Sequence, residues 1–540
     1  MLLQTSLQNP NVSLSSSLSY SRSSFPWRNP SYTLLPHSVN YRRFSVSCSI
    51  SQVHSYGTLD YERRPMVKWN AIYKRISLME NPELGSGTVL NQWEKEGRQL
   101  SKWELCRVIK ELRKFKRFER ALEVYYWMNN RGERFRLSSS DAAIQLDLIA
   151  KVHGISAAEN FFLSLSDSSK DKRIYGALLN AYVRARMKEK AESLLDKMRI
   201  KGHATHSLPY NVMMTLYMNL KEYEKVELMV SEILEKNIKL DVYSYNIWLS
   251  CCGSQGSAEK MEEVFEQLKS DKTINPNWTT FSTMATMYIK MGNFEKAEEC
   301  LRKVESRISG RDRIPYHYLL SLYASVGNRE EIYRVWNIYK SVFPSVPNLG
   351  YLAIISSLLR IGDIDGSEKI YEEWLPVRSS YDPRIANLFM VYHIRKGNLE
   401  KALSFIDHIV EVGGKPNSAT WEALAEGHTG EKRISRALFY WKEAFAAEGS
   451  KNWRPKPANV SCFLDLCEQE GDLESKEVLV GLLRESGYLK DELYASLVGL
   501  SPEAINDNGI ASEDGFNRDD IFENKDDESE MVLNQLQGSA

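Results

Sequence analysis

The sequence lacks the features that mark several common classes of protein. Its seven cysteines form no Cys-x-x-Cys pair and have no regular spacing, so neither a disulfide framework nor a zinc site is expected. It contains no run of about eighteen uninterrupted apolar residues, which predicts that no segment spans a membrane. Walker loops, HExxH motifs and the Cys/His signature of zinc deaminases are absent as well. We therefore expect no enzyme activity, no cofactor and no metal site.

Acidic residues are missing from the first 59 positions of the 540-residue chain. That segment is rich in serine, and arginines supply its only fixed positive charge. This composition is typical of a transit peptide, which predicts import into an organelle. The segment around Cys48 favours the chloroplast, and the mitochondrion is the alternative.

The C-terminal end has the opposite bias. Residues 502–540 hold eleven acidic residues against Arg518 and Lys525, and we expect 492–540 to be an acidic, disordered tail. The whole chain has a formal net charge of −1, which leaves the body from 60 to 501 mildly basic. A mildly basic body is compatible with a polyanionic partner but does not require one.

Two kinds of residue recur along the middle of the chain with a common period. Aromatic residues follow one another at steps of 35 or 36, and glycines follow one another at steps of 35. The aromatic residues are Tyr175, Tyr210, Tyr245, Phe281, Tyr316 and Tyr351, and the glycines are Gly292, Gly327, Gly362 and Gly397. A period between about 20 and 50 residues indicates a stacked array, in which each unit buries its apolar face against its neighbours.

With the aromatic residue set as position 4, the period divides the chain into about eleven units after an N-terminal helical cap at 60–101. The units are 102–136, 137–171, 172–206, 207–241, 242–277, 278–312, 313–347, 348–382, 383–417, 418–456 and 457–491. Positions 1–13 and 16–30 each show helical apolar spacing, and a short break separates them. The sequence predicts an all-α, right-handed solenoid of helix-turn-helix repeats, with position 4 in the core.

The period and the content of the units resemble the pentatricopeptide repeat family. The similarity is clearest in SLPYNVMMTLYMNLKEYEKVELMVSEILEKNIKLD (207–241), VYSYNIWLSCCGSQGSAEKMEEVFEQL (242–268) and MVYHIRKGNLEKALSFIDHIVEVGGKPN (390–417). The 34-residue tetratricopeptide pattern does not hold. The resemblance covers most of the chain, and it implies a plant organellar protein of the P class, without an editing or nuclease domain.

The resemblance also implies how such a protein recognises RNA. Positions 5 and 35 of a unit together read one base, and position 2 flanks it. Helical geometry places positions 2, 5 and 13 on one face, away from the core. The pairs carried over to this chain are Asn211 with Asp241, Asn246 with Asn277, Ser282 with Asp312, Asn387 with Asn417, and Ser461 with Asp491. The pair Asn211 with Asp241 resembles a uracil reader, the two Asn–Asn pairs resemble pyrimidine readers, and the two Ser pairs resemble weaker purine readers.

Other units depart from this pattern at position 5, which holds Cys106, Gly176, His317, Leu352 and Glu422. A leucine cannot hydrogen-bond a base, so we expect RNA binding that is short, structural or assisted by other proteins. A second explanation of Asp or Asn at position 35 is helix capping, because that residue directly precedes a helix. Capping does not explain Asn at position 5, inside a helix.

Basic residues occupy position 13 in five units, namely Lys114, Arg184, Lys290, Arg360 and Arg395. The resemblance implies that they contact the RNA backbone. Ordinary solvated charge at the end of a helix, where cations are favourable, is the alternative. Position 2 is apolar or aromatic at Leu208 and Tyr243, where a base or a neighbouring unit could cover the side chain.

Together these features predict an organellar protein that binds single-stranded RNA. It would act in RNA stabilisation, processing, splicing or translation, without catalysis. The alternative is a protein-interaction or ribosome-associated scaffold, which the departures at position 5 favour. Expected partners are organellar RNA and, beyond it, the ribosome or other RNA-processing proteins, and we expect neither a membrane nor a small-molecule substrate.

Overall fold

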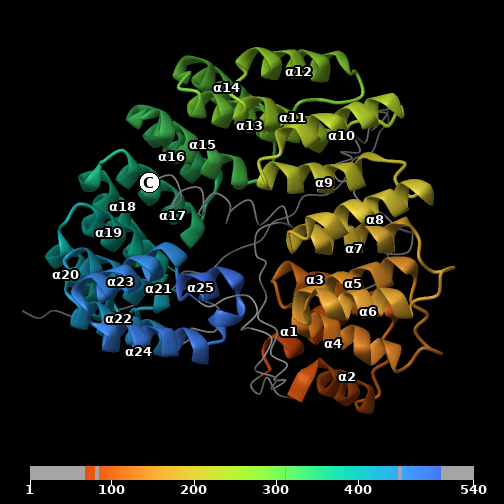
Figure 1. Ribbon diagram of the computed structural model, residues 1–540, viewed down its shortest axis with the longest axis horizontal. Helices are drawn as coiled ribbons and strands as arrows, with labels where there is room; N and C mark the ends of the chain where they lie inside the picture. The colour runs from red at the N-terminus through yellow and green to blue at the C-terminus, as the bar shows by residue number, and fades with distance from the viewer. Residues whose placement is uncertain (1–66, 80–83, 311, 379, 448–452, 500–540) are drawn as a thin grey trace, which may run out of the picture. The chain divides into compact units, whose positions relative to one another are not determined.

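The computed structural model describes residues 67–79, 84–310, 312–378, 380–447 and 453–499, and the structural statements below concern these residues. The expected transit peptide (1–59) and residues 500–540 of the expected tail lie outside them. No β-strand occurs in the described parts of the chain, and the helices follow one another in pairs (Figure 1). The predicted all-α solenoid of helix pairs is confirmed.

The first helices of the pairs are α1 (Val67–Ser77), α3 (Lys102–Lys114), α5 (Ser139–Val152), α7 (Lys172–Arg184), α9 (Ser207–Asn219), α11 (Val242–Ser254), α13 (Trp278–Lys290), α15 (Ile314–Val326), α17 (Asn348–Arg360), α19 (Pro383–Arg395), α21 (Ser418–Gly430) and α23 (Pro457–Glu470). The second helices are α2 (Gly85–Lys95), α4 (Phe118–Asn129), α6 (Gly154–Ser164), α8 (Lys188–Ile200), α10 (Tyr223–Glu235), α12 (Ala258–Ser270), α14 (Phe294–Ser306), α16 (Arg329–Val342), α18 (Ile364–Val377), α20 (Leu399–Glu411), α22 (Ile434–Ala446) and α24 (Leu473–Glu485). The 3₁₀ turn η4 (Tyr488–Lys490) and α25 (Glu492–Leu497) follow.

The helices form two layers. From α7 to α21, each first helix contacts the first helix before it and the one after it. Each second helix from α4 to α24 packs on the first helix of its own pair. A first helix is therefore covered on three sides, and its fourth side forms one surface with the corresponding sides of its neighbours.

The core runs along the stack without interruption over most of its length. One cluster of buried apolar residues extends from Ile72 to Phe389, and two smaller clusters continue it through the last pairs. The aromatic residue at position 4 is buried in all six units in which it marks the period, and Tyr210 is fully buried. The prediction that position 4 is core is confirmed.

The break between the two helices of a unit has a regular backbone. Position 15 adopts a positive φ in nearly every unit, with φ 75° at Gly292 and 83° at Gly327. The residue after it caps the second helix, as Asn293 and Asn328 do. Glycine adopts this conformation without steric cost, which explains the glycine ladder in the sequence. Lys116, Arg186, Lys221 and Lys432 adopt the same conformation in other units.

The C-terminal end of the stack differs from the expectation of a tail that starts at residue 492. Residues 492–497 form α25, and its Tyr494 is fully buried. The Tyr494 hydroxyl donates to the carbonyl of Pro455 and accepts from Arg454 Nε at 3.1 Å. Glu492 precedes an aromatic residue that completes the core, so acidic composition alone gave the wrong boundary for the tail.

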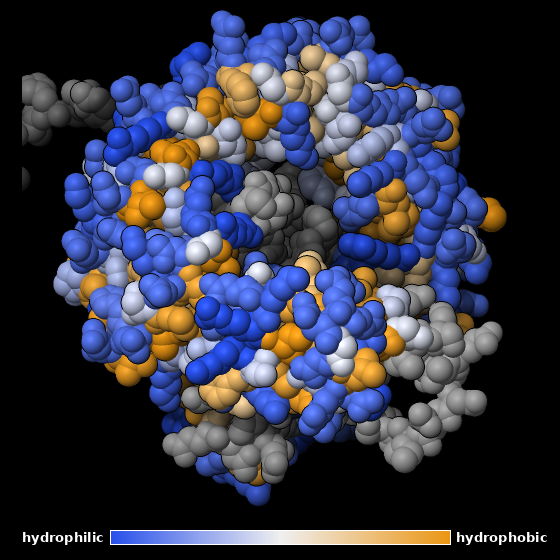
Figure 2. All heavy atoms as spheres, turned by 60° about the vertical axis from the view of Figure 1, so that its left-hand side comes forward, coloured by the Kyte–Doolittle hydropathy of each residue, from blue (hydrophilic) through white to orange (hydrophobic). Residues whose placement is uncertain are grey.

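The visible surface is mostly hydrophilic, and its apolar residues lie in separate small patches (Figure 2). None of the helices described here is long and apolar enough to cross a membrane.

Candidate nucleic-acid interface

The clearest arrangement of predicted base-reading residues joins α19 to the start of α21. Asn387 Nδ2 donates to Asn417 Oδ1 at 3.2 Å, thirty residues later in the chain. Thr420 Oγ1 lies 2.8 Å from Asn387 Oδ1 and 2.8 Å from Asn417 Oδ1. Asn387 is half-buried. The structure thus brings positions 5 and 35 of this unit into direct contact.

The same arrangement occurs at the start of α11. Asn211 Nδ2 lies 3.2 Å from Asp241 Oδ1, and Ser244 Oγ donates to Asn211 Oδ1 at 2.8 Å. Asn211 differs from Asn387 in being only 1% exposed. Its amide has the same two kinds of partner as that of Asn387 but is less accessible to a base.

Asn246 has a different set of contacts. Its Nδ2 donates to Thr279 Oγ1 at 3.0 Å, and that hydroxyl lies 2.6 Å from Asn277 Oδ1. The link between positions 5 and 35 therefore runs through a threonine. Among the described residues, Asn246 Oδ1 has no hydrogen-bond partner.

The two Ser pairs are not arranged in this way. The buried Ser282 donates to the carbonyl of Thr279 in its own helix at 2.9 Å, and Asp312 Oδ1 accepts from the backbone N–H of Ile314. Ser461 Oγ lies 3.3 Å from Asp465 Oδ2, and Asp491 binds Arg454. Each of these four residues has a partner other than the one that the pairing implies.

Helix capping and amide orientation use the same residues. Asp241, Asn277, Asp382 and Asn417 each accept hydrogen bonds from backbone N–H groups at the start of the next first helix. Asp312 also accepts such a hydrogen bond, although it lies one residue before Arg313, the N-cap of α15. Capping is thus present at position 35, and at Asp241 and Asn417 it coexists with the contact to position 5.

Three units that depart from the pairing pattern bury their position 5. Leu352 is 1% exposed. His317 contacts Tyr339 Oη at 3.3 Å, and burial, with Arg313 nearby, lowers the pKa of His317 to about 4. Glu422 accepts from the backbone N–H of Lys456 at 2.7 Å, and burial raises the pKa of this carboxyl. These three side chains pack inside the protein and are not exposed on the surface on which RNA would bind.

Glu422 also accounts for the stretched unit 418–456. Besides the Lys456 N–H, it accepts from Trp453 Nε1 at 3.0 Å and Asn459 Nδ2 at 3.1 Å. These donors lie just before α23 and in its first turn. The carboxylate at position 5 therefore holds the longer connection to the next first helix in place through hydrogen bonds.

The cations at position 13 fall into two groups. Lys114, Lys290 and Arg395 are exposed. Arg184 was expected to contact the RNA backbone, but its side chain is only 7% exposed and forms an ion pair with the buried Asp147. Arg360 is half-buried and donates to Ser325 Oγ at 2.8 Å on the neighbouring first helix. Both arginines link adjacent units.

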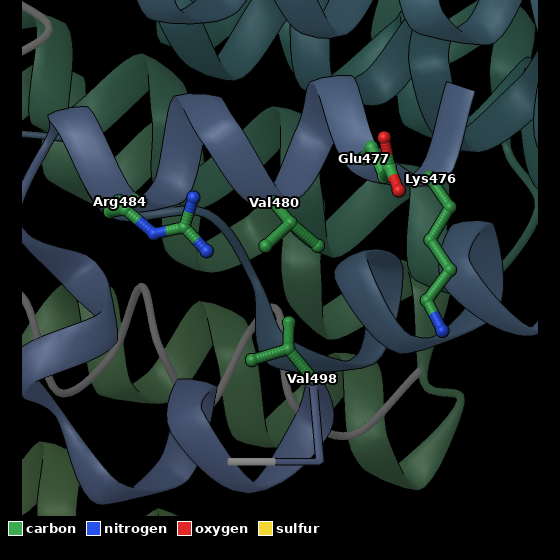
Figure 3. Close-up of a pocket in the computed structure, with 5 residues that line it drawn as sticks. All are labelled: Lys476, Glu477, Val480, Arg484 and Val498. Atoms are coloured by element: carbon green, nitrogen blue, oxygen red, sulfur yellow. The ribbon is translucent and has the colours of Figure 1, made fainter. Parts of the chain in front are cut away.

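One pocket lies outside this surface, between α24 and the end of α25 (Figure 3). Val480 and Val498 face each other there, with Lys476 and Arg484 toward its two ends. The pocket combines opposite charges with two valines and holds no convergent polar groups. In the described parts of the chain, no cluster of His, Cys, Asp or Glu has the arrangement of a metal site.

The hydroxyls of Ser244 and Thr420 were not identified from the sequence, although they contact two of the predicted amides. Both are at position 3 of a unit and form capping boxes with the preceding position 35. The Asp-x-x-Ser and Asn-x-x-Thr spacings signal such a box in the sequence. Combined with the 35-residue period, that spacing could have indicated contact with the preceding position 5.

Known proteins share this repeat pattern. The sequence profile of the pentatricopeptide repeat domain matches residues 228–307, and that of the PPR repeat matches 173–203 and 209–238. A pentatricopeptide repeat-containing protein of Arabidopsis thaliana is 64% identical over 92% of this chain and 94% of its own length. A second Arabidopsis thaliana protein of this kind, named as mitochondrial, is 34% identical over 81% of this chain and 89% of its own.

Two further similarities concern a ribosomal protein and a solved structure. The large ribosomal subunit protein mL101 of Arabidopsis thaliana is 33% identical over 80% of this chain and 88% of its own length. The crystal structure of the maize pentatricopeptide repeat protein PPR10 matches with a TM-score of 0.38 and 18% identity, over 79% of this chain and 65% of that one. The helix pairs, their period and the sequence relatives agree: this chain belongs to the pentatricopeptide repeat family.

Proposed function

We propose that this chain binds single-stranded RNA along the exposed side of its first helices and catalyses no reaction on it. The observation that carries the proposal is the contact between Asn387 and Asn417, which orients a half-buried amide across a unit boundary. An oriented amide offers a donor and an acceptor in fixed directions, which is what recognition of a base edge requires.

The structure supports recognition of only a few bases. Asn246 and Asn387 are half-buried amides, whereas Leu352, His317 and Glu422 are buried in the fold. At position 2 of two units, Leu208 (46% exposed) and Tyr243 (52% exposed) provide apolar surface, against which bases can stack. Lys114, Lys290 and Arg395 would supply phosphate contacts that do not depend on sequence.

The proposed role is stabilisation, processing, splicing or translation of an organellar transcript by occupancy of the RNA. The acid-free leader supports import, and we propose the chloroplast as the destination, with the mitochondrion as the alternative. Several relatives are named as mitochondrial. A fluorescent protein fused to residues 1–59 that stayed in the cytosol would contradict an organellar role.

The direct test measures RNA affinity of residues 60–540 before and after Asn387→Leu. Short RNA oligomers that differ at a single position are compared, and the wild type should prefer one base at that position. The leucine removes the donor and the acceptor, so the preference should fall by about 1–3 kcal/mol, the worth of a base-edge contact. Asn337→Leu, on the exposed side of α16, is the matched control and should change nothing. Equal affinity of the wild type for all oligomers would contradict base reading.

A second candidate function is that of a ribosome-associated scaffold. It is favoured by the similarity to mL101 together with the buried position 5 in several units. In this case the chain should co-sediment with organellar ribosomal subunits after free RNA is digested. Recovery in a narrow RNA footprint, away from ribosomal fractions, would favour the first function.

A further inference from the structure

We propose that the hydroxyl at position 3 of a unit is a positioning residue for the base-reading amide of the unit before it. Thr420 would position Asn387, and Ser244 would position Asn211. This inference rests on the proposed RNA-binding function, and it adds a third residue, from the following unit, to each of the two pairs.

Hydrogen-bond accounting at Thr420 indicates where its hydroxyl proton goes. Asn417 Oδ1 accepts from the Thr420 N–H at 2.9 Å and from Asn387 Nδ2 at 3.2 Å, which occupies both of its lone pairs. Thr420 Oγ1 accepts from the Asn417 N–H at 3.0 Å. Asn417 Oδ1 also lies 2.8 Å from this hydroxyl, but its lone pairs are occupied, so the single proton of Thr420 Oγ1 is directed to Asn387 Oδ1, 2.8 Å away.

This arrangement allows only one orientation of the Asn387 amide. A rotation of the amide by 180° would place its oxygen against Asn417 Oδ1, so that two acceptors would face each other. In the observed orientation, one N–H and one lone pair of Asn387 remain without a partner in this trio. The order in which donor and acceptor face a base is thus set by Thr420 and Asn417 together.

Ser244 repeats the arrangement at a distant site in the stack. Its Oγ lies 2.8 Å from Asn211 Oδ1, with the same separation of 33 residues as between Thr420 and Asn387. Ser244 and Thr420 are both fully buried. Water therefore does not compete for either hydroxyl, and each hydrogen bond is stronger than one at the surface and orients the amide more firmly.

Unit 242–277 provides an internal contrast. Thr280 Oγ1 lies 3.5 Å from Asn277 Oδ1, and Asn246 instead donates to Thr279, at position 2. No hydroxyl in the described structure donates to Asn246 Oδ1. This unit lacks the position-3 contact, and its amide should discriminate between bases less sharply than that of Asn387.

The test selects RNA from a pool with random bases, using residues 60–540, and sequences the bound fraction. Thr420→Val removes the hydroxyl at nearly constant volume, and Thr420→Ser retains it. Thr420→Val should reduce the base preference at one position about threefold to tenfold, the effect of one neutral hydrogen bond, and Thr420→Ser should restore it. Ser244→Ala should act at a different position, five bases away, since α19 is the fifth first helix after α9.

Ser475→Ala is the matched control for loss of a capping hydroxyl. Ser475 Oγ contacts Asp472 Oδ2 at 2.8 Å at the start of α24, a second helix, in an Asp-x-x-Ser cap like that of Ser244. It should leave every base preference unchanged. Melting temperatures of all variants show whether each one is folded.

The outcomes separate this inference from the function on which it rests. If Asn387→Leu abolishes a preference that Thr420→Val leaves intact, the position-3 inference is wrong and base reading stands. If Ser475→Ala changes the preferences as much as Thr420→Val does, the effect is one of capping and the inference is also wrong. A wild type without any base preference overturns both.

Discussion

Arg184 donates from Nη1 to Asp147 Oδ1 at 2.6 Å, and both side chains are less than one-tenth exposed. Arg113 and Lys151 each approach Asp147 Oδ2 at 3.3 Å. The cluster joins α3, α5 and α7. Burial by itself would raise the pKa of Asp147, but Arg184, Lys151 and Arg113 outweigh it and hold the pKa at about 2.

Replacing this carboxylate should destabilise the N-terminal part of the stack. Asp147→Asn leaves three cations around a neutral group, and we expect a loss on the order of 3 kcal/mol, as when one partner of a buried ion pair is removed. Chemical denaturation followed by circular dichroism measures this loss. Asp167→Asn is the control, because Asp167 is highly exposed in its pair with Lys170 and should matter little. Equal effects of the two changes would contradict the role assigned to the cluster.

The contribution of Asp147 should also depend on pH. Its folded pKa lies below the ordinary value of about 3.9, so its stabilisation is complete above that value and is lost as the pH falls toward 2. The wild type should therefore lose stability relative to Asp147→Asn between about pH 5 and pH 2. Unfolding midpoints of both proteins across this range test the sign. A constant difference between them would show that Asp147 does not titrate in this way.

Two glycines should respond in opposite ways to alanine. Gly176 lies inside α7 with open space around it, so Gly176→Ala should stabilise the protein by about 0.5–1 kcal/mol through helix propensity. Gly327 also faces open space, but its φ of 83° disfavours a side chain. Gly327→Ala should therefore cost about 1 kcal/mol. Thermal unfolding of the pair, at matched pH, gives both values, and effects of the same sign would contradict the backbone explanation.

The two groups of position-13 cations should separate in RNA binding. Lys290→Ala and Arg395→Ala should weaken binding to all sequences equally and reduce the slope of log affinity against log salt by about 0.7 for each lost contact. Arg184→Ala should mainly reduce stability, because its guanidinium is committed to Asp147. Lys197→Ala, an exposed change on the second helix α8, is the control for net charge. Equal slopes for Lys290→Ala and Lys197→Ala would contradict a phosphate contact at position 13.

The period of the sequence was sufficient to predict the helix pairs, because nearly all units bury an apolar residue, aromatic in six of them, at the same place. It could not predict which residues of a first helix are exposed. A first helix is covered by its own second helix and by two neighbouring first helices, so its buried stripe is wide. In α15 that stripe includes both Tyr316 and His317, although the sequence assigned these adjacent positions to opposite roles.

The Asp147 cluster could not be predicted for a related reason. Arg113 and Arg184 each resemble a solvated charge at the end of a helix when one unit is read alone. Only the stacking of three units brings them to the same carboxylate. Contacts between units depend on how neighbouring helices approach each other, and a repeat pattern does not contain that information.

The contacts of Asn417 also set a limit on how such repeats can be exchanged during evolution or in engineering. Asn417 is the last residue of its unit, yet it contacts both Asn387, earlier in the same unit, and Thr420, in the following unit. A segment that carries all three must run from 383 to 420, three residues into the next unit. Neighbouring segments of this kind overlap, so swapping one repeat at its formal boundary also changes a residue in contact with the repeat before it.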